Sequence, residues 1–161
     1  MPQNGLIDWN RALPFVKALK VTKQAEISPW AVFTQACHET GFFKKVIGGN
    51  NYWGIKKPRR WDGLVCNVPT HEYINGEKVA MWAEFADWDT ADEAVAFYLN
   101  LLKTLYPDTL KCRNCAYCFF DGLVVGKFKW ATDPSYKEKL FELYKMLNRE
   151  EDIQKNFNLY V

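Results

Sequence analysis

Apolar positions recur with helical spacing in five stretches of the chain, which we predict to be helices: residues 8–26, 29–40, 91–106, 109–125 and 134–147. Capping residues mark the ends of two of them. Ser28 places a hydroxyl before a proline at the first helical position, and Gly41 is suited to end the same helix. Thr90 and Glu93 form a capping box at the start of the third main helix. The chain is therefore predicted to be mostly helical.

Residues 48–88 follow a different pattern, with several glycines, a basic run and short alternating segments. Two of these segments, Thr70–Ile74 and Glu77–Trp82, flank the dipeptide Asn75-Gly76, and Asn-Gly between strand-like runs is a strong hairpin signal. We therefore predict an α+β fold that is predominantly α-helical. In it, residues 1–161 form one domain, and a small β-hairpin lobe at about residues 61–88 is inserted between the second and third main helices.

Composition excludes several classes of protein. Hydrophobic residues make up 48% of the chain and charged residues 25%, which argues against disorder. No apolar run reaches the roughly 18 residues of a membrane-spanning helix, so we expect no membrane insertion. A net charge of +2 does not suggest a nucleic-acid partner. The N-terminal residues show no secretory signal, so we expect the protein to be cytoplasmic until it is released.

Five cysteines are present, and three of them are crowded at Cys112, Cys115 and Cys118. Because the number is odd and the spacing of three places these side chains on one helical stripe, we interpret them as reduced thiols in the core. The alternative is a zinc site in which the three are ligands and Cys66 or His71 is the fourth. We favour core cysteines and expect no metal and no cofactor.

Glu39 is the most informative candidate for catalysis. It lies in the last turn of the helix over residues 29–40, and the positions three, four and seven residues before it are Ala36, Gln35 and Val32. Desolvation and the negative end of the helix dipole both favour the protonated carboxyl, so its pKa should be raised. Such a group can protonate the leaving oxygen of a glycoside. A solvated glutamate at a helix end is the alternative.

A second candidate site follows in the loop after this helix. Asn50, Asn51, Tyr52 and Trp53 combine two amides with two aromatic rings, a mixture suited to the polar edges and apolar faces of sugars. The same residues could equally form a tight turn packed on the core. His38 has no HExxH pattern around it, because residue 42 is phenylalanine, so we interpret it as structural.

Three motifs, QACHETGFF at residues 35–43, NNYWGIK at 50–56 and WATDPSYKEKL at 130–140, resemble a known family. They are similar to the peptidoglycan N-acetylglucosaminidases of glycoside hydrolase family 73, which include flagellar rod-associated wall hydrolases, autolysins and phage lysins. The resemblance covers about residues 10–147. It implies a lysozyme-like helical domain with a mobile β-lobe, which binds peptidoglycan glycan strands and cleaves the β-1,4 bond next to N-acetylglucosamine. We expect the protein to be a monomer. The setting would be a phage endolysin or an autolysin.

The resemblance also implies roles for individual residues. The family's catalytic acid falls on Glu39, and its second carboxylate falls on the segment that contains Glu72, with Glu77 and Glu84 as weaker rivals. Hairpin registration around Asn75-Gly76 pairs Glu72 with Val79. Alternatively, the acetamido group of the substrate acts in place of Glu72. The residues expected to bind substrate are Asn50, Asn51, Tyr52, Trp53, Tyr73, Trp130 and Thr132.

Trp130 departs from the family pattern, which usually has tyrosine before the ATDP segment. Tryptophan can stack on a sugar but offers no phenolic hydroxyl, so Tyr52 or Tyr136 would have to replace that group. Two other readings remain open on the same fold: a lytic transglycosylase or muramidase, and a non-catalytic wall-binding module.

The 26 aromatic residues divide into two predicted groups. The residues expected in the core are Phe33, Phe97, Phe119, Phe120, Phe141 and Tyr144. Those expected along one groove near Glu39 are Tyr52, Trp53, Tyr73, Trp82 and Trp130.

Overall fold

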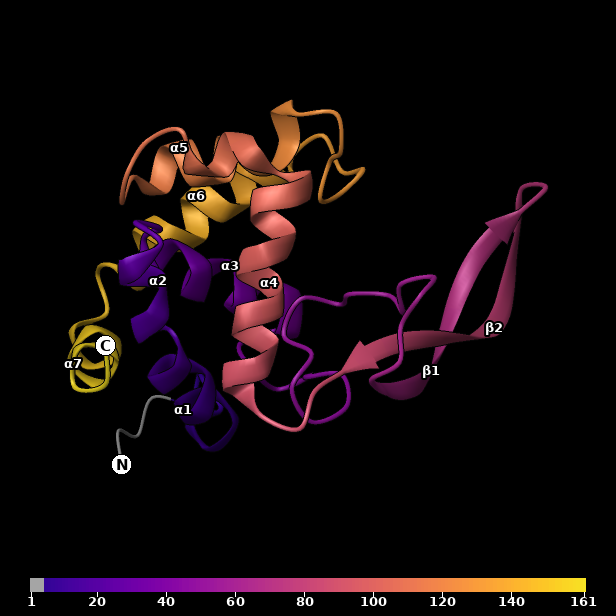
Figure 1. Cartoon of the computed structure of the whole chain (residues 1–161), viewed down its shortest axis with the longest axis horizontal. Helices are drawn as coiled ribbons and strands as arrows, with labels where there is room; N and C mark the ends of the chain where they lie inside the picture. Colours follow the sequence, from indigo (N-terminus) through magenta and orange to yellow (C-terminus); the bar gives the residue numbers. More distant parts are fainter. Residues whose placement is uncertain (1–4) are drawn as a thin grey trace.

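A computed structural model describes residues 5–161, which form a helical body and one long projecting hairpin (Figure 1). The elements in chain order are α1 (Trp9–Ala18), α2 (Lys20–Gln24), α3 (Pro29–Thr40), β1 (Leu64–Ile74), β2 (Glu77–Asp87), α4 (Ala91–Leu105), the 3₁₀ helix η1 (Pro107–Leu110), α5 (Ala116–Val125), α6 (Tyr136–Leu147) and α7 (Glu151–Asn158). The hairpin is inserted between α3 and α4 and extends away from the body. The predicted α+β, predominantly helical fold is confirmed.

Two of the predicted helices are interrupted. The stretch over residues 8–26 breaks at Leu19, which ends α1 and begins α2, and its N–H group bonds to the carbonyls of both Phe15 and Val16. The stretch over residues 109–125 breaks because Asn114 has a φ of 53°, a left-handed conformation that an α-helix does not accommodate. The backbone N–H of Asn114 donates to the carbonyl of Glu26, 2.8 Å away, so a contact distant in sequence holds the break.

Helix α7 was not predicted from the sequence. Its apolar residues Ile153 and Phe157 are four positions apart and both buried, as expected for a short amphipathic helix. The Phe157 ring packs against Trp30 and Phe33 of α3, with centroids 4.6 and 5.1 Å apart. Tertiary packing therefore stabilises a helix whose local signal is weak.

The hairpin has the predicted register and is longer than predicted. Asn75 and Gly76 both have positive φ, 51° and 81°, as the tight turn requires, and Glu72 pairs with Val79. The strands continue for 11 residues each, so the pairing extends back to Leu64 and Asp87. Most side chains near the turn are exposed on both faces. The hairpin is therefore stabilised chiefly by the hydrogen bonds between β1 and β2 and by the buried residues Phe85 and Ala86 where it joins the body.

Helix α3 occupies the centre of the body, where all its residues from Ala31 to Cys37 are buried. Phe33, Phe119 and Phe120 lie in the core as predicted, and Phe141 and Tyr144 are partly buried against it. Phe97 is an exception, because it is only partly buried and lines a cleft. None of the helices in the described residues is long and apolar enough to cross a membrane.

The interpretation of the crowded cysteines as core thiols is wrong. Cys112 and Cys118 form a disulfide, and Cys112 is exposed. Cys115 remains free and partly exposed at the N-cap of α5, where its Sγ accepts from the N–H of Cys118. The reason is the break at Asn114, which removes these residues from a common helical stripe.

Candidate active site

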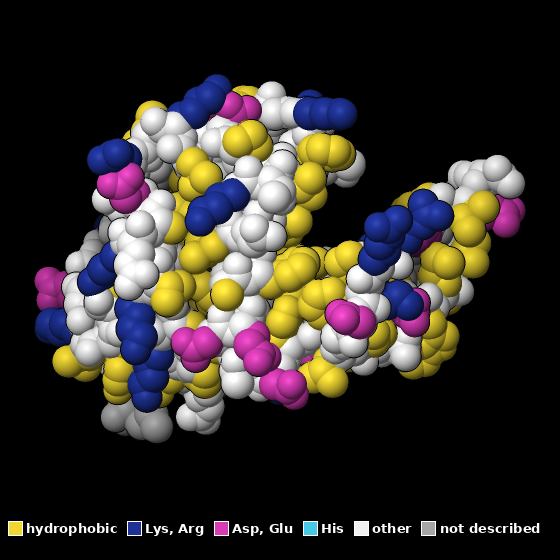
Figure 2. Space-filling view, in the orientation of Figure 1, with side chains coloured by type: hydrophobic (Ala, Val, Ile, Leu, Met, Phe, Trp, Pro, Cys, Tyr) yellow, Lys and Arg dark blue, Asp and Glu magenta, His cyan; other side chains and the backbone are white. Residues whose placement is uncertain are grey.

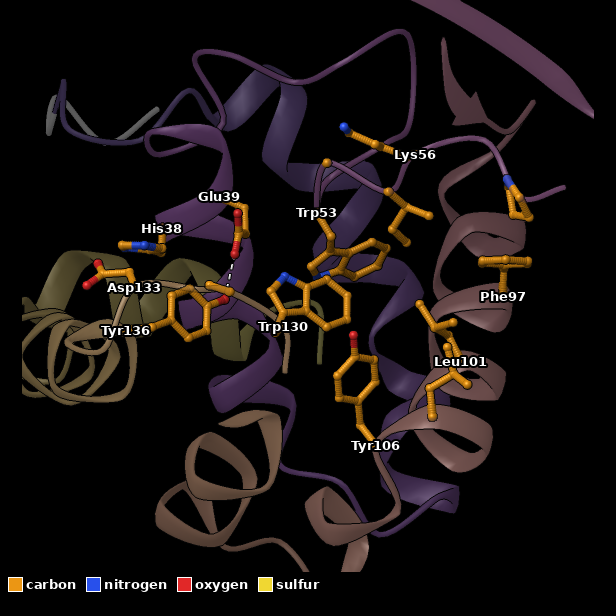
Figure 3. Close-up of a pocket in the computed structure, with 15 residues that line it drawn as sticks. His38, Glu39, Trp53, Lys56, Phe97, Leu101, Tyr106, Trp130, Asp133 and Tyr136 are labelled. Carbon is orange, nitrogen blue, oxygen red and sulfur yellow. Dashed lines mark hydrogen bonds between the residues drawn. The ribbon is translucent and has the colours of Figure 1, made fainter. Parts of the chain in front are cut away.

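A cleft of about 610 Å³ lies beside the C-terminal end of α3. In space-filling view, a deep hollow floored by apolar side chains separates the helical body from the hairpin (Figure 2). One wall of the cleft is polar and holds Glu39, His38, Asp133 and Tyr136. The opposite wall is apolar and comes from α4, with Phe97, Leu101 and Leu105, while Trp53 and Trp130 lie between the walls (Figure 3).

Glu39 lies in the last turn of α3, which Gly41 ends with a φ of 54°. Its side chain is partly buried, and burial raises the pKa of this carboxyl above its ordinary value. Hydrogen bonding from Tyr136, the charge of His38 and hydrogen bonding from the Trp130 indole oppose that rise in pKa without cancelling it. A carboxyl in this environment retains its proton at higher pH than a solvated glutamate, which suits a general acid.

Tyr136 makes the closest contact with Glu39. Its hydroxyl donates to Glu39 Oε1 at 2.5 Å, drawn as the dashed line in Figure 3. The ring is almost wholly buried and lies edge-on to His38, with centroids 5.4 Å apart. Burial, followed by the negative charge of Glu39, raises the pKa of Tyr136, so the phenol stays neutral and can donate. Tyr136 therefore supplies the phenolic hydroxyl that Trp130 lacks.

Two buried polar residues continue this contact into the core. Gln35 Nε2 donates to the Tyr136 hydroxyl at 3.1 Å, and the Tyr98 hydroxyl donates to Gln35 Oε1. The Tyr98 ring stacks face to face on Trp53, with centroids 3.9 Å apart and planes 1° apart. Trp130 meets the same ring edge-on at 5.7 Å. Tyr98 therefore lies behind the aromatic residues of the cleft and connects them, through Gln35 and Tyr136, to Glu39.

The loop before the hairpin is held by amide side chains that point into the protein. Asn51 is buried, and its Nδ2 donates to the carbonyls of Ile55 and Ala86 at 2.9 and 2.8 Å. Its Oδ1 accepts from the N–H groups of Trp53 and Ile55 at 3.3 and 3.1 Å. These bonds fix the segment that places Trp53 and Ile55 on the cleft.

The neighbours of Asn51 are also turned inward. Asn50 donates from Nδ2 to the carbonyl of Trp88 at 2.9 Å and accepts from the Tyr52 hydroxyl at 2.9 Å. The Tyr52 ring is buried against Phe15, with centroids 4.6 Å apart. These two side chains and Asn51 are not among the residues that line the cleft.

Glu72 lies on the hairpin rather than in the cleft lining. Its Oε1 is 3.0 Å from the Nζ of Lys56, which does line the cleft. Tyr73 and Trp82 are 76% and 70% exposed on the hairpin, and Thr132 is exposed beside the polar wall. The structure thus brings Glu39, Trp53 and Trp130 together and leaves the other predicted site residues around or behind them.

The sequence did not predict several of the residues that line the cleft: Lys56, Phe97, Leu101, Leu105, Tyr106 and Asp133. It named Tyr136 only as one of two tyrosines that could replace a missing hydroxyl. The contact of Gln35 with this site could have been predicted, because Gln35 is four residues before Glu39 on the same helix and therefore on the same face.

Within the described residues, no group of three or more His, Cys, Asp or Glu side chains is arranged to hold a metal ion.

Comparison with known proteins gives one family. Residues 16–149 match the Glucosaminidase family, described as mannosyl-glycoprotein endo-beta-N-acetylglucosaminidase. Among curated proteins, the peptidoglycan hydrolase FlgJ of Salmonella typhimurium is 26% identical over 144 residues, covering 85% of this chain and 45% of that protein. FlgJ of Vibrio parahaemolyticus is 27% identical over 133 residues, covering 78% of this chain and 42% of that protein. The chain thus spans less than half the length of these relatives.

Solved structures agree with this match. The C-terminally truncated glycoside hydrolase domain of Salmonella typhimurium FlgJ superposes with a TM-score of 0.70 at 25% identity, covering 87% of this chain and 97% of that one. The catalytic domain of the Listeria monocytogenes autolysin Auto has a TM-score of 0.73 at 19% identity, covering 92% and 88%, and so shares the fold.

Proposed function

The chain belongs to the glucosaminidase family, as its motifs predicted, and from that premise we propose that it is a peptidoglycan hydrolase that cleaves the N-acetylglucosaminyl β-1,4 bond. The observation that carries the proposal is the Glu39 carboxyl, whose pKa is raised by burial and which lies in an open cleft with an aromatic floor. Relatives named peptidoglycan hydrolases support the choice of substrate. Residues 1–161 would act as one catalytic domain.

In this mechanism Glu39 protonates the glycosidic oxygen while positive charge develops on the sugar. Trp130 offers an apolar surface to the sugar rings, the buried Trp53 supports the floor of the cleft from its stack on Tyr98, and the α4 wall excludes water from one side. Glu72 would activate the attacking water from the hairpin, unless the 2-acetamido group of the substrate attacks instead. Asn50, Asn51 and Tyr52 would act on the substrate indirectly, because they hold the loop that carries Trp53.

A turbidity assay on purified cell walls tests the activity. Wild-type protein should clear the walls, and Glu39→Gln should be slower by at least about 100-fold, since general acid catalysis contributes about 10²–10⁴. Glu142→Gln is the matched control, because Glu142 is an exposed residue of α6 paired with Lys145. Full activity in Glu39→Gln would refute the assignment of the acid. Binding without clearing by wild-type protein would identify a non-catalytic module.

Mass spectrometry of the digested walls tests the bond. The proposal expects reducing N-acetylglucosamine ends. Reducing N-acetylmuramic ends would instead identify a muramidase, and anhydro ends a lytic transglycosylase. Glu72→Gln tests the second carboxylate, with Glu142→Gln again as the control, and Glu77→Gln and Glu84→Gln test its two weaker rivals. Unchanged turnover in Glu72→Gln would contradict its role, and unchanged turnover in all three variants would leave the acetamido group of the substrate as the nucleophile.

The biological setting we propose is that of an endolysin or an autolysin, since either protein must cut the wall of the cell that makes it. Expression inside a bacterial host, with and without a co-expressed holin, separates the two. Rapid lysis that depends on the holin is expected for an endolysin. Lysis without the holin would favour an autolysin that reaches the wall by another route.

A further inference from the structure

We propose that Gln35 and Tyr98 are positioning residues, which orient the Tyr136 hydroxyl so that the acidic proton of Glu39 sits on Oε2. This inference rests on the proposed role of Glu39 as the acid. The two residues come from α3 and α4, and both side chains are 0% exposed. Neither lines the cleft, so neither is expected to touch substrate.

The hydrogen bonds from Tyr98 to Glu39 run in one direction. A tyrosine hydroxyl has a single proton to donate. Because the Tyr136 oxygen accepts from Gln35 Nε2 at 3.1 Å, its own proton is directed to Glu39 Oε1 at 2.5 Å. Whether the Tyr136 hydroxyl donates to Glu39 or accepts from it therefore depends on which end of the Gln35 amide faces Tyr136.

Tyr98 fixes the orientation of that amide. Its hydroxyl donates to Gln35 Oε1, and within the described part of the chain no other acceptor bonds this hydroxyl. A reversed amide would turn Nε2 toward Tyr98 and leave the buried Tyr98 proton without an acceptor, which is costly in a site away from water. Stacking on Trp53 at 3.9 Å holds the Tyr98 ring in place.

The consequence for Glu39 concerns its two oxygens. Since Oε1 accepts from Tyr136, the proton of the neutral carboxyl belongs on Oε2. Figure 3 shows the other Glu39 oxygen pointing away from Tyr136. With a reversed amide, Tyr136 would donate to Gln35 and accept from Glu39, and the acidic proton would then be turned toward the protein. A general acid needs its proton on the oxygen that reaches the leaving group.

Several charged and titratable groups face this carboxyl, and all of them except Tyr98 stay unchanged in the test. They are His38 on α3, Tyr98 on α4, Tyr136 on α6, and Lys56, Tyr106 and Asp133 elsewhere around the cleft. Tyr98→Phe removes one hydroxyl proton and leaves the formal charge of all the other groups unchanged. It is therefore the sharpest perturbation of the orientation alone.

We expect Tyr98→Phe to lower kcat by about three- to tenfold, the loss of one hydrogen bond, with KM changed by less than about twofold. Because the Tyr136 hydroxyl no longer donates consistently to ionised Glu39, the alkaline limb of the kcat profile should move to higher pH. Tyr144→Phe, the same change on a different helix, α6, should alter neither. Gln35→Met, which removes both amide bonds, is the second variant in case Tyr98→Phe does not fold.

Three outcomes would overturn the proposal. If the effects of Tyr98→Phe and Gln35→Met multiply in the double variant, the residues do not act through one chain of hydrogen bonds. If the pH profiles are unchanged while only thermal stability falls, their role is merely structural. Titration of the Glu39 carboxyl carbon by NMR in the free protein decides the question without substrate. If the pKa of Glu39 is the same in the folded variants as in wild type, Gln35 and Tyr98 do not orient the Tyr136 hydroxyl. That conclusion would hold even if peptidoglycan proved not to be the substrate.

Discussion

Replacing Asn51 by aspartate tests whether this residue acts as a structural clamp. The substitution keeps the shape of the side chain and the acceptor Oδ1, but it replaces the donor Nδ2 by an oxygen. That oxygen would face the carbonyls of Ile55 and Ala86, which now accept from Nδ2 at 2.9 and 2.8 Å. Two favourable contacts would become repulsive in a site that is 1% exposed.

The expected cost follows from these contacts. Each lost hydrogen bond removes about 0.5–1.5 kcal/mol, and a buried acceptor without a donor adds a penalty of its own. The carbonyl of Ile55 keeps a second donor, the N–H of Ala86 at 3.1 Å, which limits that penalty. We therefore expect Asn51→Asp to lower the free energy of unfolding by about 2–4 kcal/mol at neutral pH. For a chain of this size, Tm should fall by about 5–15 °C.

Urea denaturation and thermal melts measure this change directly. Asn100→Asp is the control, because it makes the same chemical change at an exposed position of α4 and should stay within about 0.5 kcal/mol of wild type. If Asn51→Asp unfolded as wild type does but bound glycan strands more weakly, Asn51 would contact substrate and the clamp would be wrong. A loss of both stability and turnover is expected, because the clamp places Trp53 on the cleft.

Three further predictions follow from packing and charge. Gly122→Ala should cost at least about 1–3 kcal/mol, because an added Cβ would lie 2.3 Å from the backbone nitrogen of Thr109; a neutral result in a melt would contradict the close packing of α5 on η1. Burial raises the pKa of Glu39. The free energy of unfolding of wild type should therefore fall relative to that of Glu39→Gln as pH rises above the ordinary glutamate pKa of about 4.3. The same pH dependence of stability in both proteins would contradict the raised pKa. Replacing Cys112 and Cys118 by serine should cost no more than about 2 kcal/mol in urea, because the bridge closes a short loop with a sequence separation of 6.

The parts of the fold that could be predicted are those with local causes. Ser28, Gly41, Thr90 and the Asn75-Gly76 turn each act on their immediate neighbours, and the observed caps and register follow from them. The failure at the cysteines has a distant cause. Asn114 adopts a left-handed conformation while it donates to the carbonyl of Glu26, 88 positions earlier in the chain, and no window of sequence contains that pair.

The site divides in the same way. The raised pKa of Glu39 follows from its place at the end of a buried helix, and the sequence contains both facts. The contact with Tyr136 joins residues 97 positions apart, so the motif around Tyr136 indicates a site without specifying which of its atoms meets Glu39. Asn51 was ambiguous for another reason, because an amide suited to sugar hydroxyls is equally suited to backbone carbonyls and N–H groups.

The proposed acid and the proposed base differ in how firmly they are held. Glu39 is bonded through Tyr136 to buried side chains of α3 and α4. Glu72 projects from a hairpin and pairs with Lys56, and both side chains are substantially exposed. Exposed ion pairs are worth about 0–1 kcal/mol, so a glycan strand entering the cleft could separate this pair at little cost. Proton donation needs one fixed geometry, whereas activation of water tolerates a carboxylate that approaches only after the substrate is bound. A firmly held acid and a loosely held base are therefore compatible with one reaction in this cleft.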